Sequence, residues 1–239
     1  YAKIAAAIFW VVLFYRLPSQ LTTYHFQWTV QKELICFSLK TLTSELSRML
    51  RFQADSLVAG RLLPPDLFGL YSFAKSAGLG IAASITQAYL SALYPFLCKQ
   101  LRRPSGLSHD NKSCWIVTFT VCMLFLVQAL AAPFYVTWLF DARWQGASTL
   151  VSLLCLIAIP TLLIDHHALW LRAQNKPLQE TKVVMICTSI LIACLLLIQP
   201  HTAYHTGLTG LGCSLACCLF LFGRVKHRSI IANLRAQTI

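Results

Sequence analysis

Long apolar runs, separated by short polar stretches, divide the chain into seven segments. The hydrocarbon core of a bilayer is about 30 Å thick, and a helix needs roughly 20 apolar residues to cross it. Because lipid offers the backbone no hydrogen-bond partners, such runs must be helical. The pattern predicts an all-α fold, a polytopic transmembrane helical bundle of about seven membrane segments. The predicted segments are residues 2–15, 34–59, 67–97, 114–134, 147–171, 183–199 and 207–223.

The first segment is short for a membrane span. The chain opens at Tyr1 rather than Met, and the segment lacks the basic region and cleavage site of a signal peptide. We therefore interpret the chain as a fragment, in which residues 1–33 are a truncated helix of a preceding half and a cytoplasmic linker. Residues 34–223 are predicted to form a six-helix transmembrane bundle, and residues 224–239 a basic cytoplasmic tail.

Composition and charge support a membrane protein. Hydrophobic residues make up 57% of the chain and charged residues 12%, whereas soluble domains carry about 25% charged residues. The net charge of +12 does not indicate nucleic-acid binding, because the basic residues are spread between apolar segments. Thirteen Lys and Arg lie in one alternating set of connections and three in the other. The positive-inside rule then predicts that residues 16–33, 98–113 and 172–182 and the C-terminus are cytoplasmic.

Neither cysteines nor histidines indicate a metal or cofactor. Most of the ten cysteines lie in apolar segments without a CxxC pair, which is typical of small buried hydrophobic residues. His201 and His205 are four residues apart, but Pro200 and Gly207 favour a turn there rather than a helix. Hydrolase, P-loop and metalloprotease motifs are absent, and the outer loops are too short for a catalytic domain. We expect no enzyme, no metal and no cofactor.

The segment from Leu34 to Gly60 is apolar, yet it carries five ionisable side chains. A charge at the bilayer centre costs about 2.5 to 3.5 kcal/mol on insertion scales. Four of the five, together with Ser44, follow steps of four, four, three and four residues, which places them on one helical face. Such a face is expected to line a cavity or the bundle interior, although Lys40 can instead extend to the headgroup layer. The five are Lys40, Glu45, Arg48, Arg51 and Asp55.

The predicted binding site consists of Arg48, Arg51, Asp55 and, from the next segment, Lys75. Arg51 and Asp55 are four residues apart and are expected to pair. Converging cations predict a strongly positive cavity for an anionic ligand such as a phosphate or pyrophosphate, which Arg binds bidentately. Two alternatives stay open: a purely structural Arg51–Asp55 pair, and a Glu45–Arg48 pair that reduces the free positive charge.

Asp165 and His166 form a second candidate site, for proton or cation coupling. They are adjacent titratable residues in the predicted segment 147–171. Because Arg172 marks the end of that span only a turn or so further on, a solvated interfacial role is the competing interpretation.

Four stretches resemble, in matching order, the polysaccharide-biosynthesis flippase family, whose superfamily also contains multidrug exporters and lipid II flippases. The family pattern is an Arg and an Asp in a helix that ends near Gly, followed by Gly-x-Tyr in the next helix. Here the matching residues are Arg51, Asp55, Gly60, Gly69 and Tyr71. The later stretches resemble the segment before the family's tenth helix and its closing helices. All the stretches are Arg51–Gly60 with Leu67–Ala74, Ala132–Ala147, Leu171–Lys176 and Gly207–Gly210.

The resemblance implies a flippase that moves a polyprenyl-pyrophosphate-linked oligosaccharide across the bacterial cytoplasmic (inner) membrane by alternating access. The chain would be the C-terminal half of a protein with about 12–14 helices, whose two halves enclose a cavity. Arg48, Arg51 and Lys75 would attract the headgroup, and Asp55 would orient Arg51. The implied partners are the lipid-linked anionic oligosaccharide, membrane lipids, and a glycan polymerase or other assembly protein, with no nucleic acid.

Three other functions remain open. A cation-coupled multidrug antiporter of the same superfamily would favour acidic cavity residues. A membrane enzyme of glycan assembly would need a catalytic His or acid in a sizeable outer loop. A structural membrane subunit would tolerate the loss of Arg48 or Lys75.

Overall fold

The computed structural model describes residue 9 and residues 28–101, 110–140 and 142–236. Regular structure in these ranges is helical throughout, which confirms the all-α class for the part of the chain described. Apart from Phe9, the predicted segment 2–15 lies outside the described residues. The helices are α2 (Trp28–Leu62), α3 (Pro65–Leu101), α4 (Asp110–Leu139), the 3₁₀ helix η1 (Ala142–Ala147), α5 (Ser148–Ala173), α6 (Pro177–Ile198) and α7 (Ala203–Ala236).

Five helices of the described ranges, α3 to α7, are long and apolar enough to cross a membrane. The chain is therefore a multi-pass membrane protein. α2 has 35 residues, but charged side chains interrupt its apolar run, so it is not one of the five. The described residues thus confirm five spans, and the predicted count of about seven stays a prediction. The chain divides into two compact units, residues 1–39 and 40–239. The boundary falls within α2, and the contacts and the cavity described below belong to the second unit.

Two helices extend well beyond the apolar runs that predict them. α6 begins at Pro177 rather than at residue 183, because proline fits the first helical position and the polar turn that follows continues the helix. α7 continues past residue 223, so the predicted basic tail is helical as far as Ala236. A hydropathy pattern detects the part of a helix that lies in lipid, whereas the backbone hydrogen bonds continue further.

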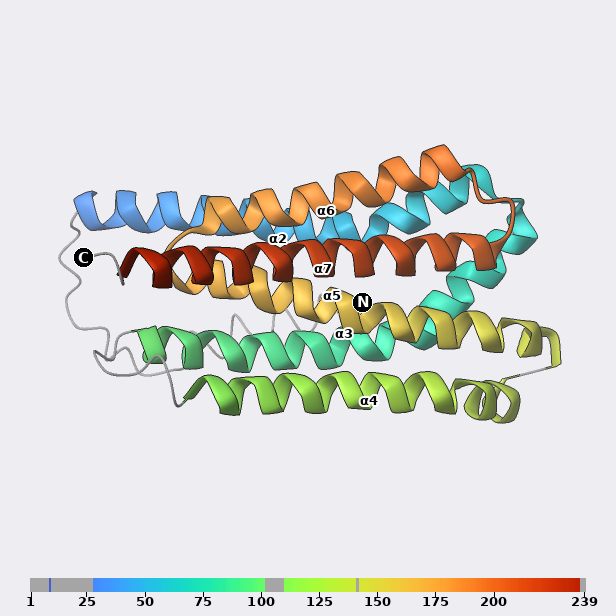
Figure 1. Cartoon of the computed structure of the whole chain (residues 1–239). Coiled ribbons are helices and arrows are strands. Elements are labelled where there is room, and N and C mark those ends of the chain that lie inside the picture. Colours follow the sequence, from blue (N-terminus) through green and yellow to red (C-terminus); the bar gives the residue numbers. More distant parts are fainter. Residues whose placement is uncertain (1–8, 10–27, 102–109, 141, 237–239) are drawn as a thin grey trace. The chain divides into compact units, whose positions relative to one another are not determined.

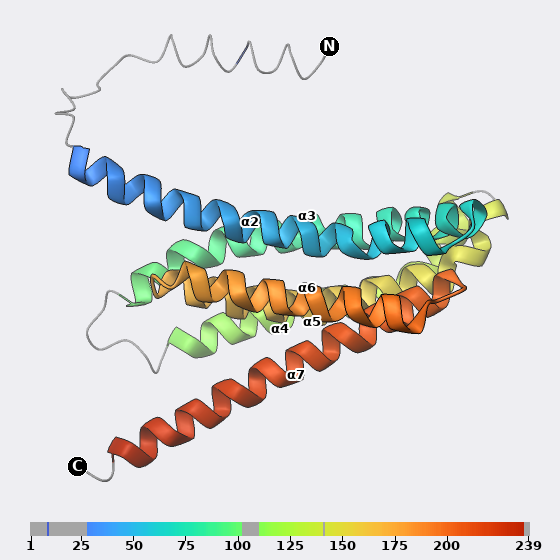
Figure 2. The same cartoon turned by 90° about the horizontal axis from the view of Figure 1, so that it is seen from above.

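Successive helices of the second unit alternate in direction (Figures 1 and 2), the arrangement that the alternating Lys and Arg content predicts. α5 lies at the centre and packs against α3, α4, α6 and α7. Its Leu150, Val151 and Leu154 are fully buried. On α4, by contrast, Phe134 and Trp138 are 78% and 89% exposed, as expected of side chains that face lipid.

The contact between α3 and α5 is close at Gly78. A Cβ added there would lie 3.2 Å from the Val151 carbonyl oxygen and 3.2 Å from Cys155 Sγ. Gln128 Nε2 also donates a hydrogen bond of 3.0 Å to the Gly78 carbonyl. Gly80, in the same helix, has no neighbouring atom within 4 Å of such a Cβ. Substitution of Gly78 therefore tests packing, and substitution of Gly80 tests helix propensity.

We predict that Gly78→Ala lowers the free energy of unfolding by about 1–3 kcal/mol, because the added methyl group overpacks against a backbone oxygen that cannot move easily. Gly80→Ala is expected to raise it by about 0.5–1 kcal/mol, because Ala has the higher helix propensity. Thermal unfolding of the two variants in detergent measures both effects. Shifts of the same sign would contradict the close contact.

Candidate functional site

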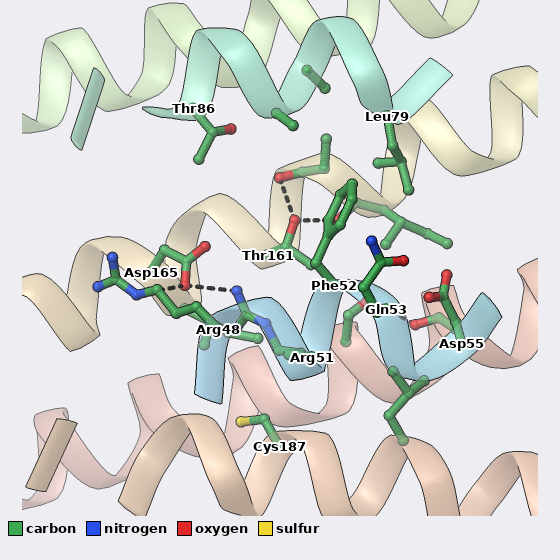
Figure 3. Close-up of a pocket in the computed structure, with 18 of the residues that line it drawn as sticks. Arg48, Arg51, Phe52, Gln53, Asp55, Leu79, Thr86, Thr161, Asp165 and Cys187 are labelled. Atoms are coloured by element: carbon green, nitrogen blue, oxygen red, sulfur yellow. Dashed lines mark hydrogen bonds and ion pairs between the residues drawn. The ribbon is translucent and has the colours of Figure 1, made fainter. Parts of the chain in front are cut away.

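A cavity of about 610 Å³ lies between α2, α3, α5, α6 and α7 in the second unit (Figure 3). Sites for small molecules and cofactors occupy about 300–1,000 Å³. The wall combines charged, amide and hydroxyl side chains with apolar ones. Its charged side chains are Glu45, Arg48, Arg51, Asp55 and Asp165.

The predicted charged face of α2 contributes directly to this cavity. Arg48, Arg51 and Asp55 are three of the four predicted substrate-binding residues, and all three line the wall. The fourth, Lys75, is buried but is not part of the wall. Lys40 is exposed and does not line the cavity either. The helical periodicity therefore predicts the orientation of the α2 side chains at the depth of the cavity.

Six charged residues from three helices form one network, which we call the inner cluster. Arg48 Nη2 donates to Glu180 Oε1 over 2.8 Å. Arg172 binds both oxygens of the same carboxylate, with Nη2 2.7 Å from Oε1 and Nε 2.8 Å from Oε2. The Glu180 side chain is completely buried. Its bonds to the two arginines compensate for the hydration that the carboxylate loses. The members are Glu45, Arg48, Arg51, Asp165, Arg172 and Glu180.

Asp165 occupies the space between two cavity arginines. Its Oδ1 accepts a hydrogen bond of 2.6 Å from Arg51 Nη2 and lies 3.8 Å from Arg48 Nε. Glu45 Oε1 completes the network, 2.7 Å from Arg172 Nη2 and 3.7 Å from Arg48 Nη1. The sequence-predicted Glu45–Arg48 pair is therefore present. Through these contacts the inner cluster connects α2 to both α5 and α6.

Arg172 and Glu180 are not among the site residues that the sequence predicts. The apolar run of the sixth segment starts at residue 183, so the hydropathy pattern places both in a polar connection. The available signal was Pro177, a residue favoured at the first helical position. A helix that begins there places Glu180 in its first turn, where a carboxylate is favourable.

A second group of residues, the outer cluster, comprises Asp55, Ser56, Tyr71 and Lys75. Lys75 Nζ lies 2.6 Å from Asp55 Oδ1 and 2.8 Å from Ser56 Oγ, and it also donates to the Phe52 carbonyl. These three bonds use all three protons of the ammonium group. Tyr71 donates to Asp55 Oδ2 over 2.6 Å. The outer cluster thus joins α2 to α3 and leaves Lys75 without a proton for a ligand.

The outer cluster corrects the predicted Arg51–Asp55 pair. Arg51 bonds to Asp165 of α5, and Asp55 bonds to Lys75 and Tyr71 of α3. An ion pair four residues apart on one helix contributes only about 0.2–0.5 kcal/mol. Arg51 and Asp55 therefore pair with residues of neighbouring helices, in less hydrated surroundings, instead of with each other.

The structure also differs from the predicted strongly positive cavity. The inner cluster contains three arginines and three carboxylates, and the outer cluster one Lys and one Asp. The additional charges come from distant segments. Even so, Arg48 Nε and Arg51 Nη1 are buried and form no hydrogen bond within the described residues. Every carboxylate of the two clusters is ion-paired, whereas these two N–H groups are still available for a hydrogen bond.

Asp165 and His166 are both buried, with 7% and 9% exposure, which favours the bundle interior over the solvated side chains of the interfacial interpretation. Adjacent helix positions point about 100° apart, and the two side chains have different surroundings. Asp165 lines the cavity. His166 Nδ1 lies 2.7 Å from the Tyr89 hydroxyl, and its ring stacks on Trp115. A role in ion coupling stays a prediction for both residues.

The histidines near the start of α7 lie at the surface of the described bundle. His201 and His205 are both exposed. Within the described ranges, no three His, Cys, Asp or Glu side chains are grouped as metal ligands. The clustered carboxylates have Lys and Arg partners instead.

Comparison with known proteins agrees with the resemblance seen in the sequence. A family model described as "Polysaccharide biosynthesis protein" matches residues 1–149. The chain is also 23% identical, over 124 residues, to the amylovoran biosynthesis protein AmsL of Erwinia amylovora. This match covers 52% of the chain and 32% of the relative, so the chain spans about a third of that protein's length. No solved structure matches the chain significantly. The chain belongs to the polysaccharide biosynthesis protein family.

Proposed function

We propose that the chain is part of a flippase that translocates a polyprenyl-pyrophosphate-linked oligosaccharide across the bacterial cytoplasmic membrane. The product would supply a surface polysaccharide such as an O-antigen, a capsule or an exopolysaccharide. Family membership supports a role in polysaccharide synthesis, and the multi-pass bundle supports a step that takes place in the membrane. The cavity offers polar groups to the headgroup, while the lipid tail stays in the bilayer.

The unused arginine donors of the cavity carry this proposal. Arg48 Nε and Arg51 Nη1 are buried N–H groups without a hydrogen-bond partner in the described part of the chain. A buried donor left unbonded costs about 1–3 kcal/mol, and more when it is charged. A phosphate oxygen satisfies such donors, since a guanidinium group binds phosphate in a planar, bidentate geometry. The two arginines are therefore suited to an anion, although the charges of the two clusters balance and the wall itself carries two arginines and three carboxylates.

Binding of the pyrophosphate would proceed by exchange of one anion for another. Asp165 Oδ1 now lies between Arg48 and Arg51. A phosphate oxygen that bonds to Arg48 Nε and Arg51 Nη1 would compete with this carboxylate for the two guanidinium groups. Displacement of Asp165 would loosen the contact between α2 and α5, which is a change that alternating access requires. The substrate would thus promote its own release to the other side.

Location and partners complete the proposal. The excess of Lys and Arg in alternate connections supports a cytoplasmic C-terminus. A glycan polymerase or another assembly protein would receive the oligosaccharide on the outer face.

We predict that Arg48→Ala and Arg51→Ala each abolish surface polysaccharide in a strain that lacks the native gene and expresses the variant protein. The change removes headgroup contacts that no neighbouring side chain replaces. Glycan staining of whole cells, with the membrane level of each variant measured by immunoblot, checks the result. Arg61→Ala is the matched control, because Arg61 is exposed at the end of α2. Normal polysaccharide from both cavity variants would overturn the proposal.

A cation-coupled multidrug antiporter is the second candidate, favoured by the four carboxylates of the clusters. They are Glu45, Asp55, Asp165 and Glu180. Each is already paired with Lys or Arg, which leaves none ready for a cationic drug. An antiporter predicts that Arg48→Ala leaves surface polysaccharide intact and changes resistance to cationic drugs.

A further inference from the structure

The cavity wall contains uncharged polar side chains that neither cluster uses. Gln53 on α2 and Thr86 and Gln87 on α3 line the cavity. Figure 3 shows Gln53 and Thr86 pointing from their helices toward the space between them. Within the described part of the chain, none of the three side chains forms a hydrogen bond, whereas the wall residues Thr161 and Ser214 donate to carbonyls of their own helices.

The position of these residues within α3 shows that they belong to a helical face. Leu79, Ala82, Ala83, Thr86, Gln87 and Leu90 all line the cavity at steps of three, one, three, one and three residues. Small alanines leave room beside the Thr and Gln side chains. An amide that faced hydrocarbon would be costly, because lipid satisfies none of its hydrogen bonds. This face of α3 thus offers the cavity two uncharged hydrogen-bonding side chains among apolar ones.

We infer that Gln53, Thr86 and Gln87 form a glycan-binding subsite beside the arginines and contact the sugar that is attached to the pyrophosphate. Sugar hydroxyls both donate and accept hydrogen bonds. A Gln amide offers two donors and an acceptor, and a Thr hydroxyl offers both functions. The apolar residues between them suit the C–H faces of a sugar ring. The inference rests on the proposed function, since the arginines must hold the pyrophosphate.

The size of the cavity supports two adjoining subsites. At about 610 Å³ it falls in the middle of the range typical of drug-sized ligands, and a pyrophosphate alone would leave much of it empty. The charged side chains of the wall come from α2 and α5, and two of the three neutral polar residues of the subsite come from α3, so the wall offers different groups to the two chemical parts of a glycosyl pyrophosphate. The neutral polar residues would then discriminate between sugars, because a site that forms a hydrogen bond with a hydroxyl rejects an analogue that lacks that hydroxyl.

The test is a binding measurement on the purified full chain in detergent, by isothermal titration calorimetry. The probes are farnesyl pyrophosphate and three farnesyl-pyrophosphate-linked sugars: glucose, galactose and N-acetylglucosamine. The wild-type protein is expected to bind at least one sugar-bearing probe about tenfold more tightly than farnesyl pyrophosphate, as one or two neutral hydrogen bonds allow. The double variant Gln53→Ala/Gln87→Ala should lose this preference and bind all probes within about twofold of farnesyl pyrophosphate.

Three comparisons separate this inference from the proposed function. Thr86→Val, which removes the hydroxyl while keeping the shape, should reduce the sugar preference, and Gln179→Ala, an exposed residue outside the cavity, should leave it intact. Arg51→Ala should weaken binding of all four probes. Wild-type protein that binds farnesyl pyrophosphate as tightly as every sugar-bearing probe would overturn the glycan subsite alone. Wild-type protein that binds none of the probes would overturn the proposed function and the subsite together.

Discussion

Glu180→Gln is expected to lower the free energy of unfolding by about 3–5 kcal/mol, the cost of removing one partner from a buried ion pair. Glu180 is completely buried and accepts hydrogen bonds from Arg48 and from two nitrogens of Arg172. Without its charge, two largely buried guanidinium groups lose their strongest shared partner. Equilibrium unfolding in detergent, followed by circular dichroism, measures the effect.

Glu45→Gln is the matched control, because Glu45 belongs to the same network but is 44% exposed. Exposed ion pairs contribute about 0–1 kcal/mol, so this variant should remain close to the wild type. The triple variant Glu180→Met/Arg48→Met/Arg172→Met should recover much of the lost stability, since apolar replacement of buried ion pairs is often neutral. Equal losses from Glu180→Gln and Glu45→Gln would mean that burial of the inner cluster does not govern its energetics.

Lys75→Met is expected to destabilise the protein by about 3–5 kcal/mol as well, because it leaves the Asp55 carboxylate without its cation. Lys75 is 7% exposed, and its ammonium protons are all used within the outer cluster. Adding Asp55→Asn should restore most of the stability, since the amide can still accept the hydrogen bond from Tyr71. Thermal unfolding of the single and double variants in detergent measures this recovery.

The control for this pair is Lys99→Met, because Lys99 is exposed in the last turn of α3. A surface change of this kind should alter stability by less than about 0.5 kcal/mol.

The double variant Lys75→Met/Asp55→Asn also tests whether Lys75 binds the headgroup, as the sequence predicts. A double variant that is stable but makes no surface polysaccharide would assign Lys75 or Asp55 to the substrate. A double variant that fails to recover stability would contradict the pairing itself.

The sequence predicts the helices and the charged face of α2 well, for physical reasons that depend on local information. Bilayer thickness sets the length of the apolar runs, and helical geometry sets the direction of Arg48, Arg51 and Asp55. Neither quantity requires knowledge of the neighbouring helices. The same holds for the alternating direction of the helices, which follows from the distribution of Lys and Arg.

The partners of those charges could not be predicted in the same way. Arg51 bonds to Asp165, which is 114 positions away in the chain, and Arg48 to Glu180, 132 positions away. Such pairs depend on which helices pack together and at which depth. Neighbours within one helix therefore do not reveal how much of the positive charge is compensated. The same holds for Asp165: its short distance from Arg172 along the chain favours an interfacial position, although both residues belong to one buried network.

The balance of charges has an electrical consequence. Four cations and four anions in the two clusters sum to zero. Under the proposed function, reorientation of these helices without substrate would move no net charge of the clusters through the membrane field. A bound pyrophosphate would add its own negative charge to the moving cavity. Each elementary charge that crosses a potential of 100 mV changes the energy by about 2.3 kcal/mol. In a cell with a negative interior, the membrane potential would therefore favour movement of the substrate-loaded cavity toward the outer face. The empty cavity would return without working against the potential.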